Sequence, residues 1–363
     1  MDEKNARARN PRIEALRLAA IVGIAVFHTF QPWFGALIDG SWDAGPATRT
    51  ALGCVSLLGT YGNHVFFLIS GFFLVPRAVD AARGNGYWPS QARAVVRRAL
   101  PILATVALYA AIALAVSSWV APIEGVSTRE TGWLVGGLQF VWVYLAVVVL
   151  APAIGWVWAR LSHPRAIVAT IAVAALLANA YIAFVSPGDE VRSLLEWRKL
   201  MSAASYLVAF LVGGALADLD LRPLSRALVP LVLVAVAIEA IAGIGGDLRL
   251  LEALSFKSTS ALSFLLAVAS LARAAQSPGT SWSSRPARTC RILARSTLGF
   301  YVAQSMFCEL WRPPLTQLTT ASLPYGEGAF LAAGIVASIV LLALFFTFDQ
   351  LVRLPALRLA HLA

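Results

Sequence analysis

An arginine and a histidine stand in the first apolar stretch of the chain, Arg17 near its start and His28 further in, with ten residues between them. On an α-helix, eleven residues rise about 16 Å and turn through about 1100°, which is three full turns plus roughly 20°. The guanidinium and the imidazole therefore share one helix face, the first near a membrane surface and the second near mid-depth. Ionisable groups inside a span are costly, so they indicate a functional site that faces protein or a wet cavity. Because an imidazole gives and takes a proton near neutral pH, this pair predicts acid–base chemistry.

Glu14 stands three residues before Arg17, a spacing at which side chains on a helix meet. A pair between them would hold the guanidinium at the membrane interface. An ordinary interfacial ion pair explains the same spacing, and the sequence leaves both interpretations open.

Within the second apolar stretch, the aromatic and aliphatic segment at residues 61–74 contains the polar side chains of Asn63, His64 and Ser70. Ser70 precedes Gly71, and small residues of this kind let helices approach closely, so packing is the favoured interpretation of that pair. His64 is expected to lie nearer the outer surface than His28, where an interfacial or a catalytic role is open.

Arg97 and Arg98 stand directly before the third apolar stretch, in a loop at residues 77–99 that is rich in arginine. A guanidinium fork matches phosphate oxygens, so these two residues could bind a phosphorylated ligand. The general excess of basic residues in cytoplasmic loops would also place arginines here.

The composition is that of a polytopic membrane protein. Of 363 residues, 59% are hydrophobic and 13% are charged, with a mean hydropathy of +0.73, whereas soluble domains carry about 25% charged residues. A helix that crosses a bilayer needs about 20 apolar residues. We therefore expect an all-α fold with about ten transmembrane helices, near residues 13–34, 56–76, 100–120, 133–158, 166–185, 202–217, 226–244, 256–273, 294–312 and 328–349.

Basic residues set the expected orientation. With a cytoplasmic amino terminus, most of the 29 Lys and Arg residues fall in segments on the inner side, and an even number of spans then puts both termini in the cytoplasm. The net charge of +10 reflects this topology and attraction to anionic lipid rather than nucleic-acid binding. We predict a basic cytoplasmic tail at 1–12, one membrane-embedded domain at 13–353 and a cytoplasmic tail at 354–363, in a bacterial inner membrane.

Two absences in the sequence narrow the classes of function. Cys54, Cys290 and Cys308 have neither the spacing of a disulfide framework nor that of a metal site, so we expect no metal. No internal repeat is visible of the kind from which many secondary transporters are built.

Five motifs, taken together, carry a family resemblance. In chain order they are Glu14-x-x-Arg17 with His28, Phe66-Phe67-x-x-Ser70-Gly71, Arg97-Arg98-Ala-Leu-Pro101, Tyr206-x-x-x-Phe210-x-x-Gly213 and Ser296-Thr-Leu-Gly299-Phe-Tyr301. The chain therefore resembles acyltransferase family 3, whose membrane proteins O-acylate surface glycans and other acceptors. It departs from the family pattern at Gln304, where a histidine is usual, at Val95, where an arginine is usual, and at Gln139, where an aromatic residue is usual.

The resemblance implies an O-acyltransferase that takes an acyl group from cytoplasmic acyl-CoA, most often acetyl-CoA. The acceptor is then a hydroxyl of a glycan or lipid-linked saccharide. The resemblance assigns catalysis to His28, Arg17 and Glu14, with His28 as the general base that removes the proton of the acceptor hydroxyl. Transfer through an acyl-histidine is a second route.

The same resemblance divides the remaining candidates between donor and acceptor. We expect Arg97 and Arg98 to hold the phosphates of CoA, with Ser70 also on the donor side. We expect His64 and Asn63 to contact the acceptor.

A second class of function fits the same buried charges. In a proton-coupled transporter or flippase of a small or lipid-linked substrate, His28 and Arg17 would form the proton or substrate site. Dependence on CoA separates the two classes, since a transporter would move its substrate without CoA.

Overall fold

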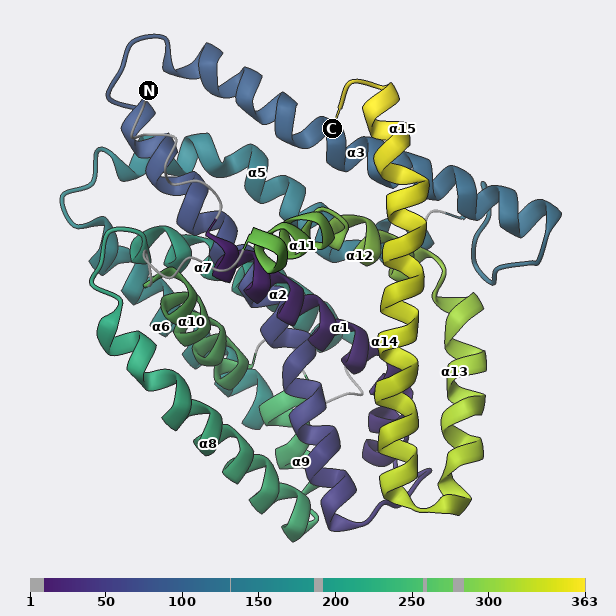
Figure 1. The fold of residues 1–363 in the computed structure, drawn as a ribbon. Coiled ribbons are helices and arrows are strands. Elements are labelled where there is room, and N and C mark those ends of the chain that lie inside the picture. Colours follow the sequence, from purple (N-terminus) through teal and green to yellow (C-terminus); the bar gives the residue numbers. More distant parts are fainter. Residues whose placement is uncertain (1–9, 131, 186–191, 257–259, 277–283, 363) are drawn as a thin grey trace. The chain divides into compact units, whose positions relative to one another are not determined.

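The computed structural model describes residues 10–130, 132–185, 192–256, 260–276 and 284–362. Within these ranges the chain is helical and has no strand (Figure 1), so the predicted all-α fold is confirmed. Among the same residues, seven helices are long and apolar enough to cross a membrane. The protein is therefore a polytopic membrane protein.

The helices overlap the apolar windows that the sequence predicted. Two of those windows, 202–217 and 256–273, correspond to shorter apolar helices at Leu200–Leu216 and Ala261–Ala275. A π-helical turn η2 (Glu252–Phe256) and a 3₁₀ turn η3 (Leu323–Tyr325) interrupt the series. The helices are α1 (Pro11–Ile38), α2 (Pro46–Ala81), α3 (Tyr87–Trp119), α4 (Gly132–Val135), α5 (Gln139–Trp158), α6 (Pro164–Phe184), α7 (Arg192–Leu216), α8 (Arg222–Gly245), α9 (Leu248–Leu251), α10 (Ala261–Ala275), α11 (Ser284–Ala294), α12 (Thr297–Met306), α13 (Cys308–Ser322), α14 (Glu327–Leu351) and α15 (Arg353–Leu359).

The apolar window at 294–312 contains a break that the sequence did not predict. Helix α12 ends before Phe307 and α13 begins after it. Across the break, the Trp311 indole N–H donates to the Gln304 carbonyl at 2.8 Å, which gives a buried carbonyl the partner it needs. The number of membrane crossings and the side on which the termini lie stay predictions.

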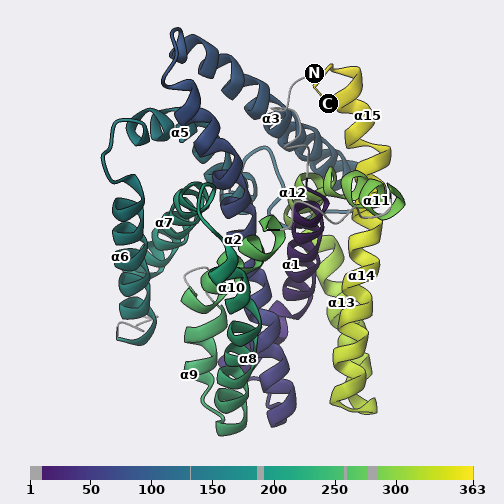
Figure 2. The ribbon, with the colours of Figure 1, turned by 60° about the vertical axis from the view of Figure 1, so that its left-hand side comes forward.

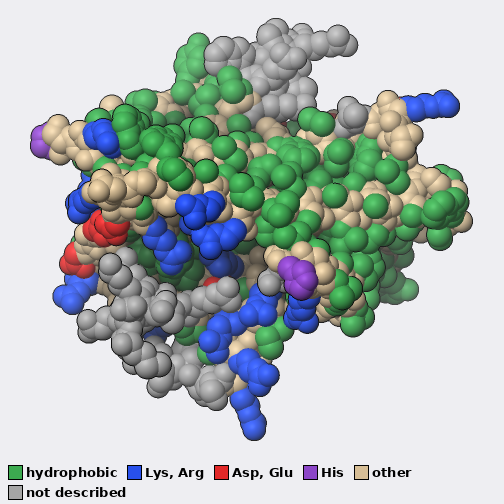
Figure 3. Space-filling view, turned by 90° about the horizontal axis from the view of Figure 1, so that it is seen from above, with side chains coloured by type: hydrophobic (Ala, Val, Ile, Leu, Met, Phe, Trp, Pro, Cys, Tyr) green, Lys and Arg blue, Asp and Glu red, His purple; other side chains and the backbone are tan. Residues whose placement is uncertain are grey.

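Large hydrophobic side chains are exposed on the outside of the helices. On α8, Leu233 is 65% exposed and Ile241 is 70% exposed. Figure 3 shows hydrophobic side chains over much of the visible surface, with Lys and Arg side chains gathered in a part of it. Extensive exposed apolar surface is unusual for soluble monomers and is suited to contact with lipid.

The helices form two compact units, and each unit is made of two separate stretches of chain. The first unit comprises the residues up to Pro76 together with Leu161–Ala294. The second comprises Arg77–Arg160 together with Arg295–Ala363. The single membrane-embedded domain expected at 13–353 stays a prediction.

In the first unit, glycines set how closely α1 and α2 pack. Gly59 faces the Phe27 ring with no room for a Cβ. Gly62 in the same way faces Ile24 and the Ala20 carbonyl. Later residues of α2 therefore meet earlier residues of α1, so the two helices run antiparallel. Helix α10 packs against α8 and α1, and α6 lies beside α7 (Figures 1 and 2).

The second unit contains a buried ion pair between Asp349 of α14 and Arg353 of α15. Arg353 Nη2 donates to Asp349 Oδ2 at 2.9 Å and to the Arg295 carbonyl at 2.7 Å. The Tyr109 hydroxyl of α3 donates to Asp349 Oδ1 at 2.9 Å. Gly299 of α12 approaches the Asp349 carboxylate so closely that a Cβ would have no room. The pair therefore joins α3, α12, α14 and α15.

We expect Arg353→Leu to destabilise the protein strongly, because Asp349 is 0% exposed and would lose its cation. Breaking a buried pair in this way costs about 3–5 kcal/mol. Thermal unfolding of the detergent-solubilised protein, followed by tryptophan fluorescence, measures the loss as a lower Tm. Arg358→Leu, which removes an exposed arginine of α15, is the control. Equal Tm values for the two variants would contradict a stabilising role of the pair.

Candidate active site

Helix α1 carries both Arg17 and His28 without interruption, as the sequence predicted. Asn10 caps the helix by accepting from the Arg12 amide N–H at 3.0 Å, and a proline follows as the first helical residue. The Asn10 side chain also donates to the Ala274 carbonyl of α10 at 3.0 Å. The start of α1 is therefore fixed to a second helix of the same unit.

Glu14 and Arg17 form the ion pair that their spacing suggested. Arg17 Nη1 lies 3.2 Å from each carboxylate oxygen of Glu14. Glu14 is 6% exposed, whereas the Arg17 side chain is 30% exposed. A guanidinium has five N–H donors, so this pair leaves donors on Arg17 for a further anion.

His28 is partly exposed, and its ring lies edge-on to Phe27 with 5.0 Å between the ring centroids. Its Nδ1 lies 3.1 Å from Gln31 Oε1. An amide oxygen only accepts hydrogen bonds, so the ring can donate to it from Nδ1. A ring that donates in this way has Nε2 for proton transfer.

The second apolar motif, at residues 66–71, lies against α7. Gly71 faces the Phe210 carbonyl, where a Cβ would have no room. Gly213 of α7 in turn faces the Leu68 carbonyl equally closely. Both glycines belong to motifs that suggested the family, and their contacts are those of closely packed helices. The packing interpretation of Gly71 is confirmed.

The polar side chains of α2 have different surroundings. Ser70 donates to a carbonyl of its own helix at 2.8 Å. Asn63 Nδ2 donates to the Tyr206 hydroxyl of α7 at 2.9 Å. His64 is 1% exposed, and its ring packs edge-on against the rings of Tyr206 and Phe264. The expected roles of Ser70 on the donor side and of Asn63 and His64 on the acceptor side stay predictions.

The prediction that His64 lies nearer the outer surface than His28 is wrong. Gly62 lies against the Ala20 carbonyl, so His64 lies closer than His28 to the amino-terminal end of α1. In the predicted orientation that end is the inner one. The reason is that α2 begins at Pro46, well before its most apolar part, so His64 stands deep along the helix rather than near its start.

Arg97 and Arg98 lie on α3, in the second unit. Arg97 is exposed and Arg98 is partly buried. The charges of Arg77 and Arg97 both act on Arg98. Like charges gathered in this way repel one another, and an anionic ligand would relieve the repulsion. The cluster suits phosphate oxygens, and the candidate residues thus come from both units.

A family model described as an acyltransferase domain, that of acyltransferase family 3, matches residues 10–348, nearly the whole chain. The chain belongs to this family. No curated protein and no solved structure matches it significantly. The protein is therefore a membrane acyltransferase, and the resemblance that the motifs suggested is confirmed.

The acyltransferase also buries polar residues that the motifs did not include. Asn179 of α6 and Ser205 of α7 lie with His64 around one small pocket. Glu239 of α8 is 0% exposed and faces Gly53, and its carboxylate has no hydrogen-bond partner among the residues that the structure describes. A signal for Asn179 and Glu239 was present in the sequence, because each is a polar side chain inside an apolar window.

We expect Gly71→Ala to destabilise the acyltransferase, because the added Cβ would meet the Phe210 carbonyl. Overpacking of this kind costs about 1–3 kcal/mol, which the fluorescence-detected Tm measures. Gly35→Ala is the matched control, since a Cβ there meets nothing within 4 Å and alanine favours the helix over glycine. If both variants kept the Tm of the unaltered protein, α2 and α7 would not pack as closely as described.

Proposed function

We propose that the acyltransferase moves an acyl group, acetyl in the simplest case, from cytoplasmic acyl-CoA to a hydroxyl of a glycan or lipid-linked saccharide. The reaction takes place at a bacterial inner membrane. One observation carries the proposal: the His28 imidazole stands in an apolar helix, with Nδ1 held by Gln31, on the helix that also carries Arg17. Such a ring is suited to proton transfer.

His28 serves as the general base. Its Nε2 takes the proton of the acceptor hydroxyl while the hydroxyl oxygen attacks the carbonyl carbon of the thioester. The carbon–sulfur bond then breaks, and the imidazolium returns the proton to the leaving thiolate of CoA. The products are an ester and free CoA, with no net uptake of protons. In a route through an acyl-histidine, Nε2 first attacks the thioester and CoA leaves, and the acceptor hydroxyl then takes the acyl group from the imidazole. The products are the same.

Cations on the donor side hold the phosphates of CoA. Arg17 stands about 16 Å before His28 along α1, a length that the extended pantetheine arm of CoA can span. Phosphates bound at Arg17 would therefore bring the thioester to the imidazole. Glu14 keeps the guanidinium in place at 3.2 Å. Arg97 and Arg98, which belong to the second unit, are assigned to the phosphates of CoA on the family resemblance.

The acceptor side is assigned to Asn63 and His64, and Ser70 is assigned to the donor side. Asn63 and His64 lie on the same helix, α2, beside the aromatic ring of Tyr206. Polar groups next to an aromatic ring suit a saccharide, which offers both hydroxyls and apolar C–H faces.

We expect His28→Ala to lose about 10²- to 10⁴-fold in transfer rate, the contribution of a general base. Membranes that contain the protein are incubated with [¹⁴C]acetyl-CoA, and ester-linked label is released by mild base and counted. His163→Ala, at an exposed histidine between α5 and α6, is the control. Wild-type rates in the His28 variant would refute the proposed base, and substrate movement without CoA would favour a transporter.

Gln31 is expected to matter through the orientation of the His28 ring. Gln31→Leu removes the acceptor of Nδ1 and should lower the transfer rate about 10- to 100-fold, as small displacements of a catalytic group do. Gln31→Glu keeps an acceptor and should retain most of the rate. The same labelling assay measures both, and equal activity of the two variants would show that this contact does not position the ring.

A further inference from the structure

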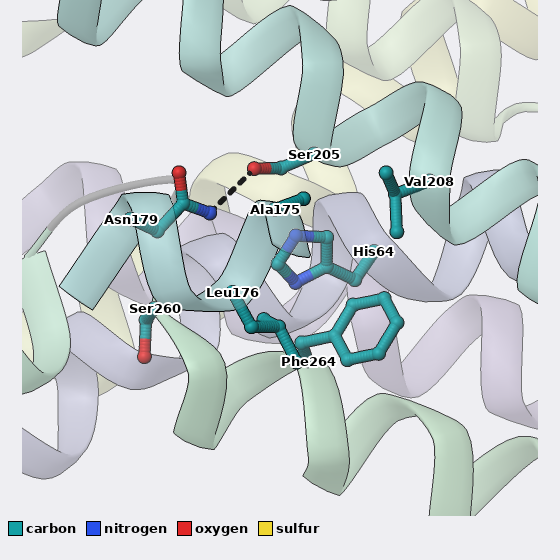
Figure 4. Close-up of a pocket in the computed structure, with 8 residues that line it drawn as sticks. All are labelled: His64, Ala175, Leu176, Asn179, Ser205, Val208, Ser260 and Phe264. Carbon is teal, nitrogen blue, oxygen red and sulfur yellow. Dashed lines mark hydrogen bonds between the residues drawn. The ribbon is translucent and has the colours of Figure 1, made fainter. Parts of the chain in front are cut away.

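A small buried pocket lies in the first unit, among α2, α6, α7 and the start of α10. Its polar lining comes from His64, Asn179, Ser205 and Ser260, one from each of these elements. Its cavity of about 10 Å³ is the size that accepts one water molecule. Figure 4 shows the His64 ring pointing toward α6, with Asn179 and Ser205 on one side of it and the Phe264 ring on another.

The polar groups of this pocket are almost fully buried, and several have unmet hydrogen bonds. His64 is 1% exposed and Asn179 is 3% exposed. Among the residues that the structure describes, neither ring nitrogen of His64 has a hydrogen-bond partner, and neither does Asn179 Oδ1. Leaving each such group unsatisfied costs about 1–3 kcal/mol. The pocket is therefore built for a polar occupant.

The other polar groups at the pocket already have partners. Asn179 Nδ2 donates to Ser205 Oγ at 2.9 Å, and Ser205 Oγ donates to the Met201 carbonyl at 2.7 Å. Ser260 Oγ donates to the Leu254 carbonyl at 2.6 Å. These bonds fix the Asn179 amide, so its oxygen and the His64 ring are the groups that a ligand would meet.

The chemistry of these groups defines the ligand. A neutral imidazole offers one donor and one acceptor, and an amide oxygen offers an acceptor. The lining residues include no charged side chain, and burying a charge without a partner is far more costly than burying a dipole. A hydroxyl, which both donates and accepts, matches these groups and the volume.

We propose that this pocket binds one uncharged hydroxyl group, held by His64 and Asn179. The hydroxyl belongs either to water or to the acceptor of the acyl group, and the second case rests on the proposed function. In the second case, Asn179 and Ser205 extend the acceptor side of the acyltransferase beyond the residues that its motifs contain.

Radiolytic footprinting of the detergent-purified protein tests the binding of a hydroxyl directly. X-rays form hydroxyl radicals from water that is bound inside a protein, and these oxidise only adjacent side chains. His64 and Phe264 should be oxidised although they are 1% and 5% exposed, whereas Phe67, at 0% exposed and stacked on Tyr206, should not. If His64 and Phe264 were oxidised no more than Phe67, the proposal would be overturned.

A variant that fills the pocket with an apolar side chain provides a second test of the same proposal. Asn179→Leu removes the amide and should reduce oxidation of His64 and Phe264 to the level of Phe67. Ser205→Ala, a milder change, should reduce it partly. Thr170→Leu introduces the same side chain on an exposed face of α6 and should leave the footprint unchanged. A footprint that persists at full strength in Asn179→Leu would refute the assignment of Asn179.

The labelling assay with [¹⁴C]acetyl-CoA identifies the source of the hydroxyl. If the acceptor enters the pocket, Asn179→Leu should lower ester-linked label about tenfold or more, the loss expected for one buried hydrogen bond to substrate, with binding of radiolabelled CoA unchanged. If water alone occupies it, the label should stay at the wild-type level while the footprint is lost. If the wild-type protein formed no ester-linked label, the proposed function would be refuted. Oxidation of His64 and Phe264 would still test whether the pocket binds a hydroxyl.

Discussion

A polar group that is buried in a helix crossing lipid must find its partner inside the protein, because the bilayer offers none. This constraint explains the main buried polar contacts. In the second unit, Arg353 and Tyr109 are the hydrogen-bond partners of Asp349. In the first unit, Arg17 is the partner of Glu14. Where described residues leave the requirement unmet, as at His64, a ligand is the natural partner.

The family motifs combine two physical roles. Gly71 and Gly299 provide space, the first for a backbone carbonyl of α7 and the second for the carboxylate of Asp349. Two other glycines of α2, Gly59 and Gly62, let that helix approach α1 closely, at Phe27 and at Ile24. These contacts help to fix the helix that carries Arg17 and His28, the residues to which the proposed chemistry is assigned.

Much of the fold could be predicted from the sequence, because the length and apolarity of a span are local properties. The Glu14–Arg17 pair was predictable for the same reason, since it depends on spacing along one helix. The depth of His64 was not, because it depends on how far α2 extends before its apolar part. The hydrogen bond between Asn179 and Ser205 depends on how α6 and α7 pack. The spacing of apolar residues along one helix does not reveal that packing.

In the proposed reaction, acyl-CoA enters from the side of Arg17 and presents its thioester to His28. A cryo-EM structure of the protein with a thioether analogue of acetyl-CoA tests it most directly. We expect the phosphates to lie at arginine side chains, Arg17 among them. We expect the carbon that replaces the thioester carbonyl to lie near His28 Nε2, so that an acceptor hydroxyl between them would contact each at about 3–3.5 Å. An acyl end bound away from His28, or a His28 ring turned into lipid, would contradict the proposed reaction.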